Sequence, residues 1–287
     1  MLQFRSWIGD LSFMFIELNT FTYMSWQHIL ICFSIYVVII GGAILLSKFV
    51  KNDKHDIILK VLAIVDLFGL IVGFAIIDGF FGDGWMYVLR MDFPLFICSS
   101  IHIALPIAAF ARGKLKQAMI EFIFVMGFLI TITGTILAAN YFNTETSIWK
   151  VIMNCIIHAA AGLTALYLVL SRRVKFNVYR WVPYALLGSI FILAILTNYL
   201  MPLIIEQVGQ PNYMFLDNPE GTDFMLFYQW FEHIFIGEFP FGKKVIYPLF
   251  HLAINYAYCA AIQLITLLVL TLKNKHYKLK KYTGKYN

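Results

Sequence analysis

Residues 27–49 read QHILICFSIYVVIIGGAILLSKF, an apolar run whose one charged residue other than histidine is Lys48, near its end. A helix that crosses a membrane needs about 20 mostly apolar residues. This run meets that requirement, and six further segments do so as well. The seven predicted spans are residues 27–49, 57–80, 92–111, 117–140, 148–171, 181–204 and 246–272. The sequence therefore predicts an all-α fold, a polytopic membrane helix bundle with seven transmembrane helices.

The composition supports a membrane protein. Of the 287 residues, 61% are hydrophobic and only 13% are charged, whereas a soluble globular domain carries about 25% charged residues. The formal net charge of +6 is therefore interpreted as a sign of membrane topology rather than of a nucleic-acid surface. The sequence has no zinc finger, RNP motif or basic region with heptads, so we expect no nucleic-acid partner. It also has no internal repeat, and residues 1–287 are predicted to form a single membrane domain.

The basic residues predict the orientation of the bundle. Four regions hold 17 of the 22 Lys and Arg residues, namely 48–60, 112–116, 172–180 and 273–287. These regions fall on alternate connections between the predicted spans. Because cytoplasmic loops carry an excess of Lys and Arg, we expect the N-terminus outside the cell and the C-terminus in the cytoplasm. The chain is then a multi-pass protein of the cell (plasma) membrane, and His55, in a basic cytoplasmic region, is expected to be solvated.

Three segments outside the spans have distinct compositions. Residues 1–26 contain acidic residues and no clean apolar run with a cleavage site, so they are interpreted as an interfacial N-terminal segment rather than a signal peptide. Residues 273–287 form a basic cytoplasmic tail. Residues 205–245 form the one long extracellular loop, which is rich in acidic and aromatic residues. Such a loop is either a cap over a cavity or an ordered loop anchored in the headgroup layer.

The cysteines do not suggest a disulfide or a metal site. Cys32, Cys98, Cys155 and Cys259 all lie within apolar runs, and no C-x-x-C pair occurs in the sequence. Neither a disulfide framework nor a zinc site is therefore indicated. The H-E-x-x-H pattern is also absent, and the intramembrane histidines belong to different spans. We expect no bound metal and no cofactor.

Polar residues inside the predicted spans are the candidates for function, because such groups are costly in a membrane and face a bundle interior or a cavity. Cys98 and His102 are four residues apart and share one helical face. A thiol beside an imidazole can act as a nucleophile, or the two can be packed structural side chains. Most of the candidates lie in the outer half of the bilayer, about 8–15 Å below the outer ends of their spans at 1.5 Å per residue. They are His28, Cys98, His102, Asn154, His158, Asn198, His251 and Asn255.

The histidines are more informative as a set than one by one, since each buried imidazole must find a hydrogen-bond partner. Asp66 lies apart from them, near the middle of the span at 57–80. A lone membrane aspartate either serves proton-coupled transport or hydrogen-bonds a neighbouring helix. Because no second carboxylate is predicted at its level, the structural role is favoured.

Three pieces of the chain resemble a known family. They are FPLFICSS at residues 93–100, NCIIHAAAG at 154–162 and PNYMFLDNP at 211–219, and a histidine near the start of the first span, in WQHILICF, also fits. These motifs and the order of the spans resemble the YwaF-type integral membrane proteins, which are related to a mammalian multi-span ether-phospholipid acyltransferase. One position departs from the family pattern Pro-Leu-His-Leu-Cys, because Phe96 stands two residues before the cysteine in place of histidine.

The resemblance implies that a cysteine accepts an acyl chain as a thioester and passes it to a lysophospholipid. It makes Cys98 the nucleophile and His158 its base, while His102 is an alternative base because it is close in sequence. An adjacent imidazole promotes the thiolate that such chemistry needs. The oxyanion also needs donors. The side-chain amides available for that role are those of Asn154, Asn198 and Asn255.

The sequence thus supports two hypotheses of different classes. The first is a membrane-embedded lipid acyltransferase or acyl hydrolase that acts on phospholipids, with membrane lipids, acyl chains or a lysophospholipid as partners. The alternative is a small-molecule or lipid transporter, or a lipid-binding membrane protein, with the same polar residues and no covalent chemistry. The substitution Cys98→Ser separates the two, because only the enzyme depends on the thiol.

Overall fold

The computed structural model describes residues 23–51, 54–73, 76, 85–87, 95–136, 148–174, 179–205, 211–217 and 225–273. The regular structure in these residues is helical, and they contain no β-strand. The longer helices are α2 (Trp26–Phe49), α3 (His55–Leu70), α5 (Ile101–Phe110), α6 (Gly113–Thr135), α7 (Ile148–Leu170), α8 (Val182–Ile204) and α10 (Tyr247–Lys273). The shorter ones are α4 (Trp85–Tyr87), η4 (Cys98–Ser100), η6 (Tyr213–Phe215), α9 (Met225–Trp230) and η7 (Gly242–Ile246).

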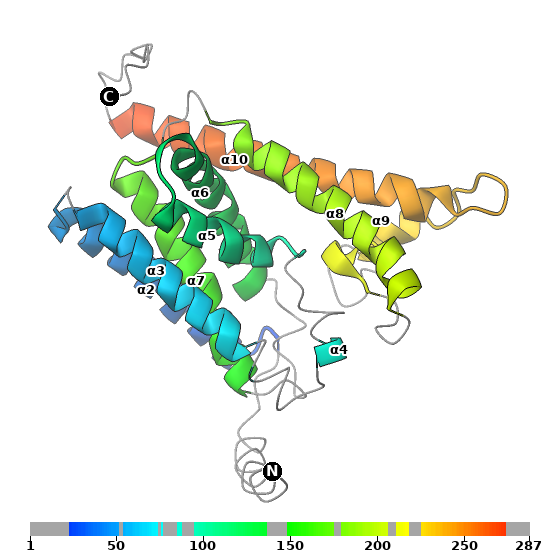
Figure 1. Cartoon of the computed structure of the whole chain (residues 1–287), viewed down its shortest axis with the longest axis horizontal. Coiled ribbons are helices and arrows are strands. Elements are labelled where there is room, and N and C mark those ends of the chain that lie inside the picture. Colours follow the sequence, from blue (N-terminus) through cyan, green and yellow to red (C-terminus); the bar gives the residue numbers. More distant parts are fainter. Residues whose placement is uncertain are drawn as a thin grey trace, which may run out of the picture.

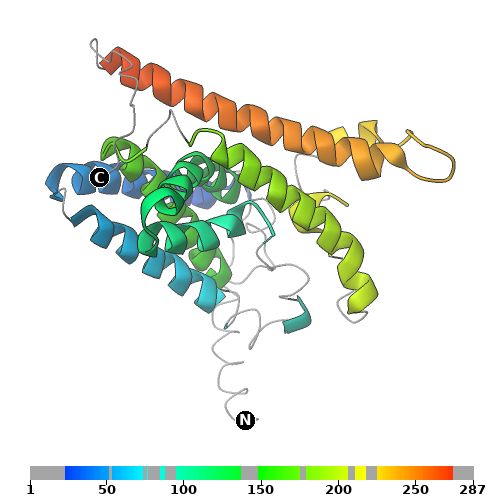
Figure 2. The ribbon, with the colours of Figure 1, turned by 45° about the horizontal axis from the view of Figure 1, so that its top comes forward.

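Helix α6 lies at the centre of the arrangement. It packs against α5 and α7, while α2 and α3 pack on α7 and α3 also contacts α5. Helices α8 and α10 contact each other and reach α6 as well, but they extend away from the other helices (Figures 1 and 2). Of the long apolar helices, α6 is the most buried. The fold is thus a bundle of α2, α3, α5, α6 and α7 with an arm formed by α8 and α10.

Five described helices are long and apolar enough to cross a membrane, which confirms a polytopic helical membrane protein. They are Trp26–Phe49, Gly113–Thr135, Val151–Leu170, Val182–Ile204 and Gly242–Val269. The two other predicted spans correspond to α3 and to η4 with α5, whose described parts are shorter. Residues 77–80 and 92–94 of those spans lie outside the described residues, as do most of the segment at 1–26 and of the tail at 273–287. Seven spans and the orientation of the termini therefore stay predictions.

Glycines allow α6 and α7 to approach closely. A Cβ at Gly127 would lie 2.7 Å from the carbonyl oxygen of Ala161, and a Cβ at Gly162 would lie 2.5 Å from Thr131 Oγ1. Thr131 uses this proximity, because its hydroxyl donates to the carbonyl of His158 at 2.9 Å. Small residues at helix contacts are the usual means of tight packing in membranes. They hold α7 rigidly against α6 at the level of His158.

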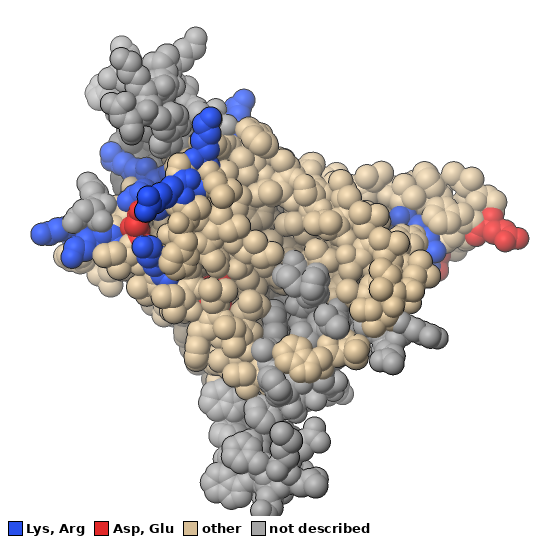
Figure 3. Space-filling model, in the orientation of Figure 1, with Lys and Arg blue, Asp and Glu red and all other residues tan. Residues whose placement is uncertain are grey.

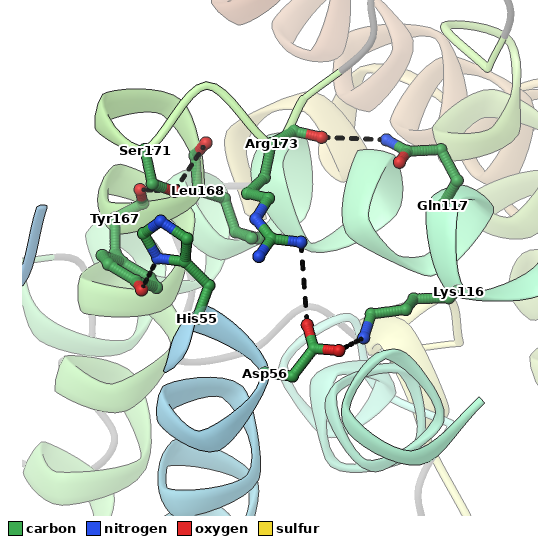
Figure 4. Close-up of polar contacts among 8 residues, drawn as sticks. All are labelled: His55, Asp56, Lys116, Gln117, Tyr167, Leu168, Ser171 and Arg173. Carbon is green, nitrogen blue, oxygen red and sulfur yellow. Dashed lines mark hydrogen bonds and ion pairs between the residues drawn. The ribbon is translucent and has the colours of Figure 1, made fainter. Parts of the chain in front are cut away.

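Near the start of α3 and of α6 and the end of α7, polar side chains join the three helices (Figure 4). Asp56 lies 2.8 Å from Lys116 Nζ and 3.6 Å from Arg173 Nη1. The hydrogen bond from Lys116 and the neighbouring positive charges lower the pKa of Asp56. The prediction that His55 is solvated is wrong, since this side chain is buried and hydrogen-bonded to the hydroxyl of Tyr167. A partner on α7, over a hundred positions away in the chain, supplies the bond that water was expected to make.

Charged residues gather at two separate ends of the molecule (Figure 3). Most Lys and Arg side chains in that view lie at the end where α2 is followed by α3 and α5 by α6. The other end, between α9 and α10, carries acidic residues and a smaller number of basic ones, including Lys243, whose Nζ lies 2.8 Å from Glu232. The surface between the two ends is almost uncharged. This pattern fits a protein that spans a membrane.

Candidate functional site

The candidate site is built around the turn that leads into α5. Cys98 begins η4, which continues directly into α5, and His102 lies one turn further on. Cys98 is half-buried and His102 is buried. Because helical side chains lean toward the N-terminus of their helix, the ring of His102 lies over the turn that contains Cys98. The structure therefore confirms that these two residues belong to the same helical stretch.

Asp66 forms a buried pair with His102. Its Oδ2 lies 2.9 Å from Nδ1 of His102, and the side chains of both residues are almost inaccessible to solvent. The second oxygen of Asp66, Oδ1, is buried and has no hydrogen-bond partner among the described residues. Asp66 thus joins α3 to α5, which is the structural role that the sequence favoured. The identity of its partner was not predicted, because 36 positions separate the two residues.

His158 on α7 is held in one tautomer. Its Nδ1 lies 2.7 Å from the backbone carbonyl of Asn154. A carbonyl only accepts hydrogen bonds, so Nδ1 carries the proton and the neutral ring has its lone pair on Nε2. That Nε2 atom is buried and has no hydrogen-bond partner among the described residues. The ring is also close enough to His102 for the two imidazoles to interact electrostatically.

The ring of His158 fits against a notch in α6. A Cβ at Gly134 would lie 1.8 Å from both Nε2 and Cδ2 of His158, a distance that no side chain tolerates. The side chain of Asn154 donates to the carbonyl of the same glycine at 2.9 Å. Gly134 therefore makes room for the imidazole, and Asn154 secures the contact from both its backbone and its side chain.

His28 contacts the next residue along α6. Its Nδ1 accepts a hydrogen bond from the backbone N–H of Met24 at 3.0 Å, and its Nε2 donates to the carbonyl of Thr135 at 2.9 Å. Both ring nitrogens take part in these bonds, and the ring is buried. His28 is thus a structural histidine that ties the start of α2 to the end of α6, beside the notch of His158.

The other predicted site residues lie on α8 and α10. His251 is buried between aromatic rings, 5.3 Å from the ring of Phe191 and 6.0 Å from that of Tyr247. Asn255 donates to the carbonyl of His251 at 2.8 Å. The polar residues that the sequence grouped together thus lie on α2, η4, α5, α7, α8 and α10.

Asn198 holds Tyr213, which follows α8 in the chain, in place. Its side chain accepts from the backbone N–H of Tyr213 at 2.8 Å and donates to the carbonyl of the same residue at 3.1 Å. This pair of hydrogen bonds fixes the backbone of residues 211–217, which we call the loop cap. Two consecutive residues in the loop cap, Met214 and Phe215, have left-handed φ angles of 61° and 53°. Such a turn costs about 1–3 kcal/mol per residue and persists because its surroundings hold it.

The loop cap also contacts the Cys98 region. The ring of Phe96 lies 5.5 Å from that of Tyr213 and 5.4 Å from that of Phe215. Phe96 is the position at which the resembled family has histidine. Here an aromatic ring takes up a packing role between the loop cap and the turn that precedes Cys98.

The side-chain amides that were expected to stabilise an oxyanion all donate hydrogen bonds to backbone carbonyls. Asn154, Asn198 and Asn255 each donate one hydrogen to a carbonyl. No group of three or more His, Cys, Asp or Glu side chains within the described part of the chain could hold a metal ion.

The fold and the buried polar residues define an all-helical, multi-pass membrane protein. A model of the TMEM164 family matches residues 23–243, most of the chain. The chain therefore belongs to the TMEM164 family, a family of transmembrane proteins. The matched region includes Asp66, Cys98, His102 and His158 and ends before His251. Comparison with curated proteins and with solved structures gave no match.

Proposed function

We propose that this protein is a membrane-embedded acyltransferase that acts on phospholipids of the plasma membrane through an acyl thioester on Cys98. With water as the acceptor, the same chemistry would make it an acyl hydrolase. The single observation that carries the proposal is that the buried Nε2 of His158 has no hydrogen-bond partner in the part of the chain that the structure describes. A buried acceptor without a partner costs about 1–3 kcal/mol, and a requirement for a base explains why such a group is kept. The resemblance to YwaF-type proteins assigns the same residue to the same role.

The proposed acylation follows from the protonation state of His158. Nε2 of the neutral ring takes the proton of the Cys98 thiol, and the thiolate attacks the carbonyl carbon of a phospholipid ester. The carbon–oxygen bond of the ester then breaks and the leaving glycerol oxygen takes up a proton from a general acid, which leaves an acyl thioester and a lysophospholipid while His158 keeps the thiol proton. In the second half, the hydroxyl of an acceptor lipid attacks the thioester and Cys98 is regenerated. This nucleophile–base logic is common to enzymes with covalent acyl intermediates.

The location of the site suits a lipid substrate. The acyl chain would stay in the bilayer, beside the surface between the charged ends that carries almost no Lys, Arg, Asp or Glu in the view of Figure 3. The headgroup would lie toward the loop cap, which contacts Phe96 just before Cys98. We infer that the loop cap limits the access of water to the thioester, since excluding water protects reactive intermediates from hydrolysis.

Acyl capture tests the proposal directly. Purified protein in lipid is incubated with a phospholipid that carries an alkyne-labelled acyl chain, and hydroxylamine-sensitive label on the protein is measured. We expect label on the wild type, none on Cys98→Ser and a strong reduction on His158→Gln. Cys32→Ser is the matched control, because Cys32 is half-buried like Cys98 and has no proposed role. Absence of label from folded wild-type protein would refute the acyltransferase.

A proton-coupled carrier of lipids or small molecules is the second candidate. The buried pair of Asp66 and His102 favours it, because intramembrane carboxylate and histidine groups form the proton relays of pumps and transporters. A carrier would move its substrate with Cys98→Ser as well as with the wild type. Uptake into proteoliposomes that is abolished by Asp66→Asn and unaffected by Cys98→Ser would support the carrier over the enzyme.

A further inference from the structure

The two buried histidines His102 and His158 are anchored in different ways. Nδ1 of His158 donates a hydrogen bond to a neutral carbonyl, that of Asn154, at 2.7 Å. His102 instead places its Nδ1 against the carboxylate of Asp66 at 2.9 Å. In both rings the anchored nitrogen is Nδ1, so the other nitrogen, Nε2, lies on the opposite edge of the imidazole. The two rings therefore have similar geometry and different electrostatic partners.

The partner decides the preferred protonation state of each ring. A carbonyl does not compensate a full positive charge, so the buried His158 is suited to start as a neutral base. A carboxylate does compensate it, as in the catalytic triads in which an aspartate stabilises an imidazolium. Without a proton shared with His102, the fully buried Asp66 would carry an uncompensated negative charge, which is strongly unfavourable. The contact of Asp66 with Nδ1 thus gives His102 the arrangement in which a carboxylate supports a histidine that transfers protons.

The two rings also influence each other. His102 and His158 interact electrostatically, and two imidazolium ions near one another in an apolar environment repel. The total charge of the site stays constant if one ring gains a proton while the other loses one.

Building on the proposed acyl transfer, we propose that His102, positioned by Asp66, is a second catalytic histidine that handles the proton of the lipid oxygen. In the first half of the reaction, His158 takes the thiol proton of Cys98. His102 gives its Nε2 proton to the glycerol oxygen as the carbon–oxygen bond of the ester breaks. In the second half, His102 takes the proton of the acceptor hydroxyl as that oxygen attacks the thioester. The leaving thiolate recovers its proton from His158, which returns every group to its initial state.

The assignment gives Asp66 a positioning role. Its carboxylate holds Nδ1 of His102, which turns Nε2 away from α3 and stabilises the charged ring. The substitution Asp66→Asn keeps the size of the side chain and removes its charge. It should therefore slow the step in which a proton is given to oxygen without affecting the ability of Cys98 to attack an ester.

The experiment compares two acyl donors that carry the same alkyne-labelled chain. One is a phospholipid, whose glycerol oxygen must be protonated as it leaves. The other is a p-nitrophenyl ester, whose leaving group departs as an anion and needs no acid. The rate of hydroxylamine-sensitive labelling of Cys98 is measured for each donor with the full chain in lipid.

We expect Asp66→Asn and His102→Gln to be acylated by the p-nitrophenyl ester at a rate close to that of the wild type. With the phospholipid they should be slower by about 10²–10⁴-fold, which is the usual contribution of a general acid. Glu121→Gln and His55→Gln are matched controls, because they change a buried carboxylate and a buried imidazole elsewhere in the bundle. Both controls should react with either donor as the wild type does.

A purely structural role would slow the two donors equally in Asp66→Asn and His102→Gln, and that result would overturn the proposal. Unchanged rates with both donors would overturn it as well. Failure of the proposed function has a different signature, because the wild type itself would then take no label on Cys98 from either donor. Labelling by the p-nitrophenyl ester also shows that a slow variant is folded around a reactive Cys98.

Discussion

Oδ2 of Asp66 lies 2.9 Å from Nδ1 of His102, and this contact joins α3 to α5 within the apolar interior of the bundle. One turn before His102 lies Cys98, and α7 carries the second imidazole that interacts with His102, that of His158. The arrangement places a thiol, two imidazoles and a carboxylate on three neighbouring helices. These four groups are the ones that the proposed acyl transfer uses.

The notch at Gly134 should tolerate no side chain. In Gly134→Ala the new methyl group would overlap the ring of His158, so either the ring or α6 must move. We expect a loss of about 1–3 kcal/mol of stability, as for other overpacked cores, together with reduced acyl capture. Thermal unfolding in detergent measures the first effect. Gly41→Ala is the control, because a Cβ there meets no atom within 4 Å, and equal stability of the two variants would contradict the tight notch.

The loop cap should depend on Asn198. In Asn198→Ala the backbone N–H and carbonyl of Tyr213 lose the partners that hold them at 2.8 and 3.1 Å. Each unsatisfied buried group costs about 1–3 kcal/mol. We therefore expect faster hydrogen exchange in residues 211–217, measured by mass spectrometry, with little change in α2. Protection that equals the wild type in these residues would show that Asn198 does not hold the loop cap.

The contact between His55 and Tyr167 should stabilise the packing of α3 on α7. Removal of the hydroxyl in Tyr167→Phe leaves the shape of the ring and deprives the buried His55 of a hydrogen bond. We expect a loss of about 1–2 kcal/mol in the free energy of unfolding. A double-mutant cycle with His55→Ala measures the coupling energy, and strictly additive effects would argue against the contact.

The ion pairs of Asp56 predict a dependence of stability on pH. Lys116 lowers the pKa of Asp56 in the folded protein from the ordinary value of 3.8. A carboxylate with a depressed folded pKa contributes stability that is complete above the unfolded pKa and is lost as the pH falls through the folded pKa. The advantage of the wild type over Asp56→Asn should thus be constant at neutral pH and shrink below about pH 4.

The size of this effect should be small, less than about 1 kcal/mol, because the Asp56 side chain is half exposed and salt screens such pairs. Unfolding is measured for both variants across the acid range at low and high salt. A wild-type advantage that grows as the pH falls would reverse the predicted sign and exclude this origin.

The orientation of the bundle is testable with single cysteines. Lys51 lies at the basic end, and Glu238 lies on the exposed stretch that follows α9. We expect a membrane-impermeant maleimide to label Glu238→Cys on intact cells and to label Lys51→Cys only after the cells are opened. Wild-type protein reports the background from the native cysteines. The opposite labelling pattern would place the N-terminus in the cytoplasm.

The sequence alone determined that the chain is a helical, polytopic membrane protein. Long apolar runs such as residues 27–49 permit few other structures, because a backbone in lipid must satisfy its own hydrogen bonds. Local spacing also identified Cys98 and His102 as neighbours on one helical face. These inferences rely on residues that are close in the chain, where helical geometry is known in advance.

Only the tertiary structure decided which polar residues meet. It paired Asp66 with His102, gave His55 a partner in Tyr167 and showed that Phe96 packs on the loop cap. These relationships depend on the rotation and depth of each helix relative to its neighbours. Rotation and depth are determined by close packing, such as that at Gly127 and Gly134, and a hydropathy pattern contains no information about the partner helix.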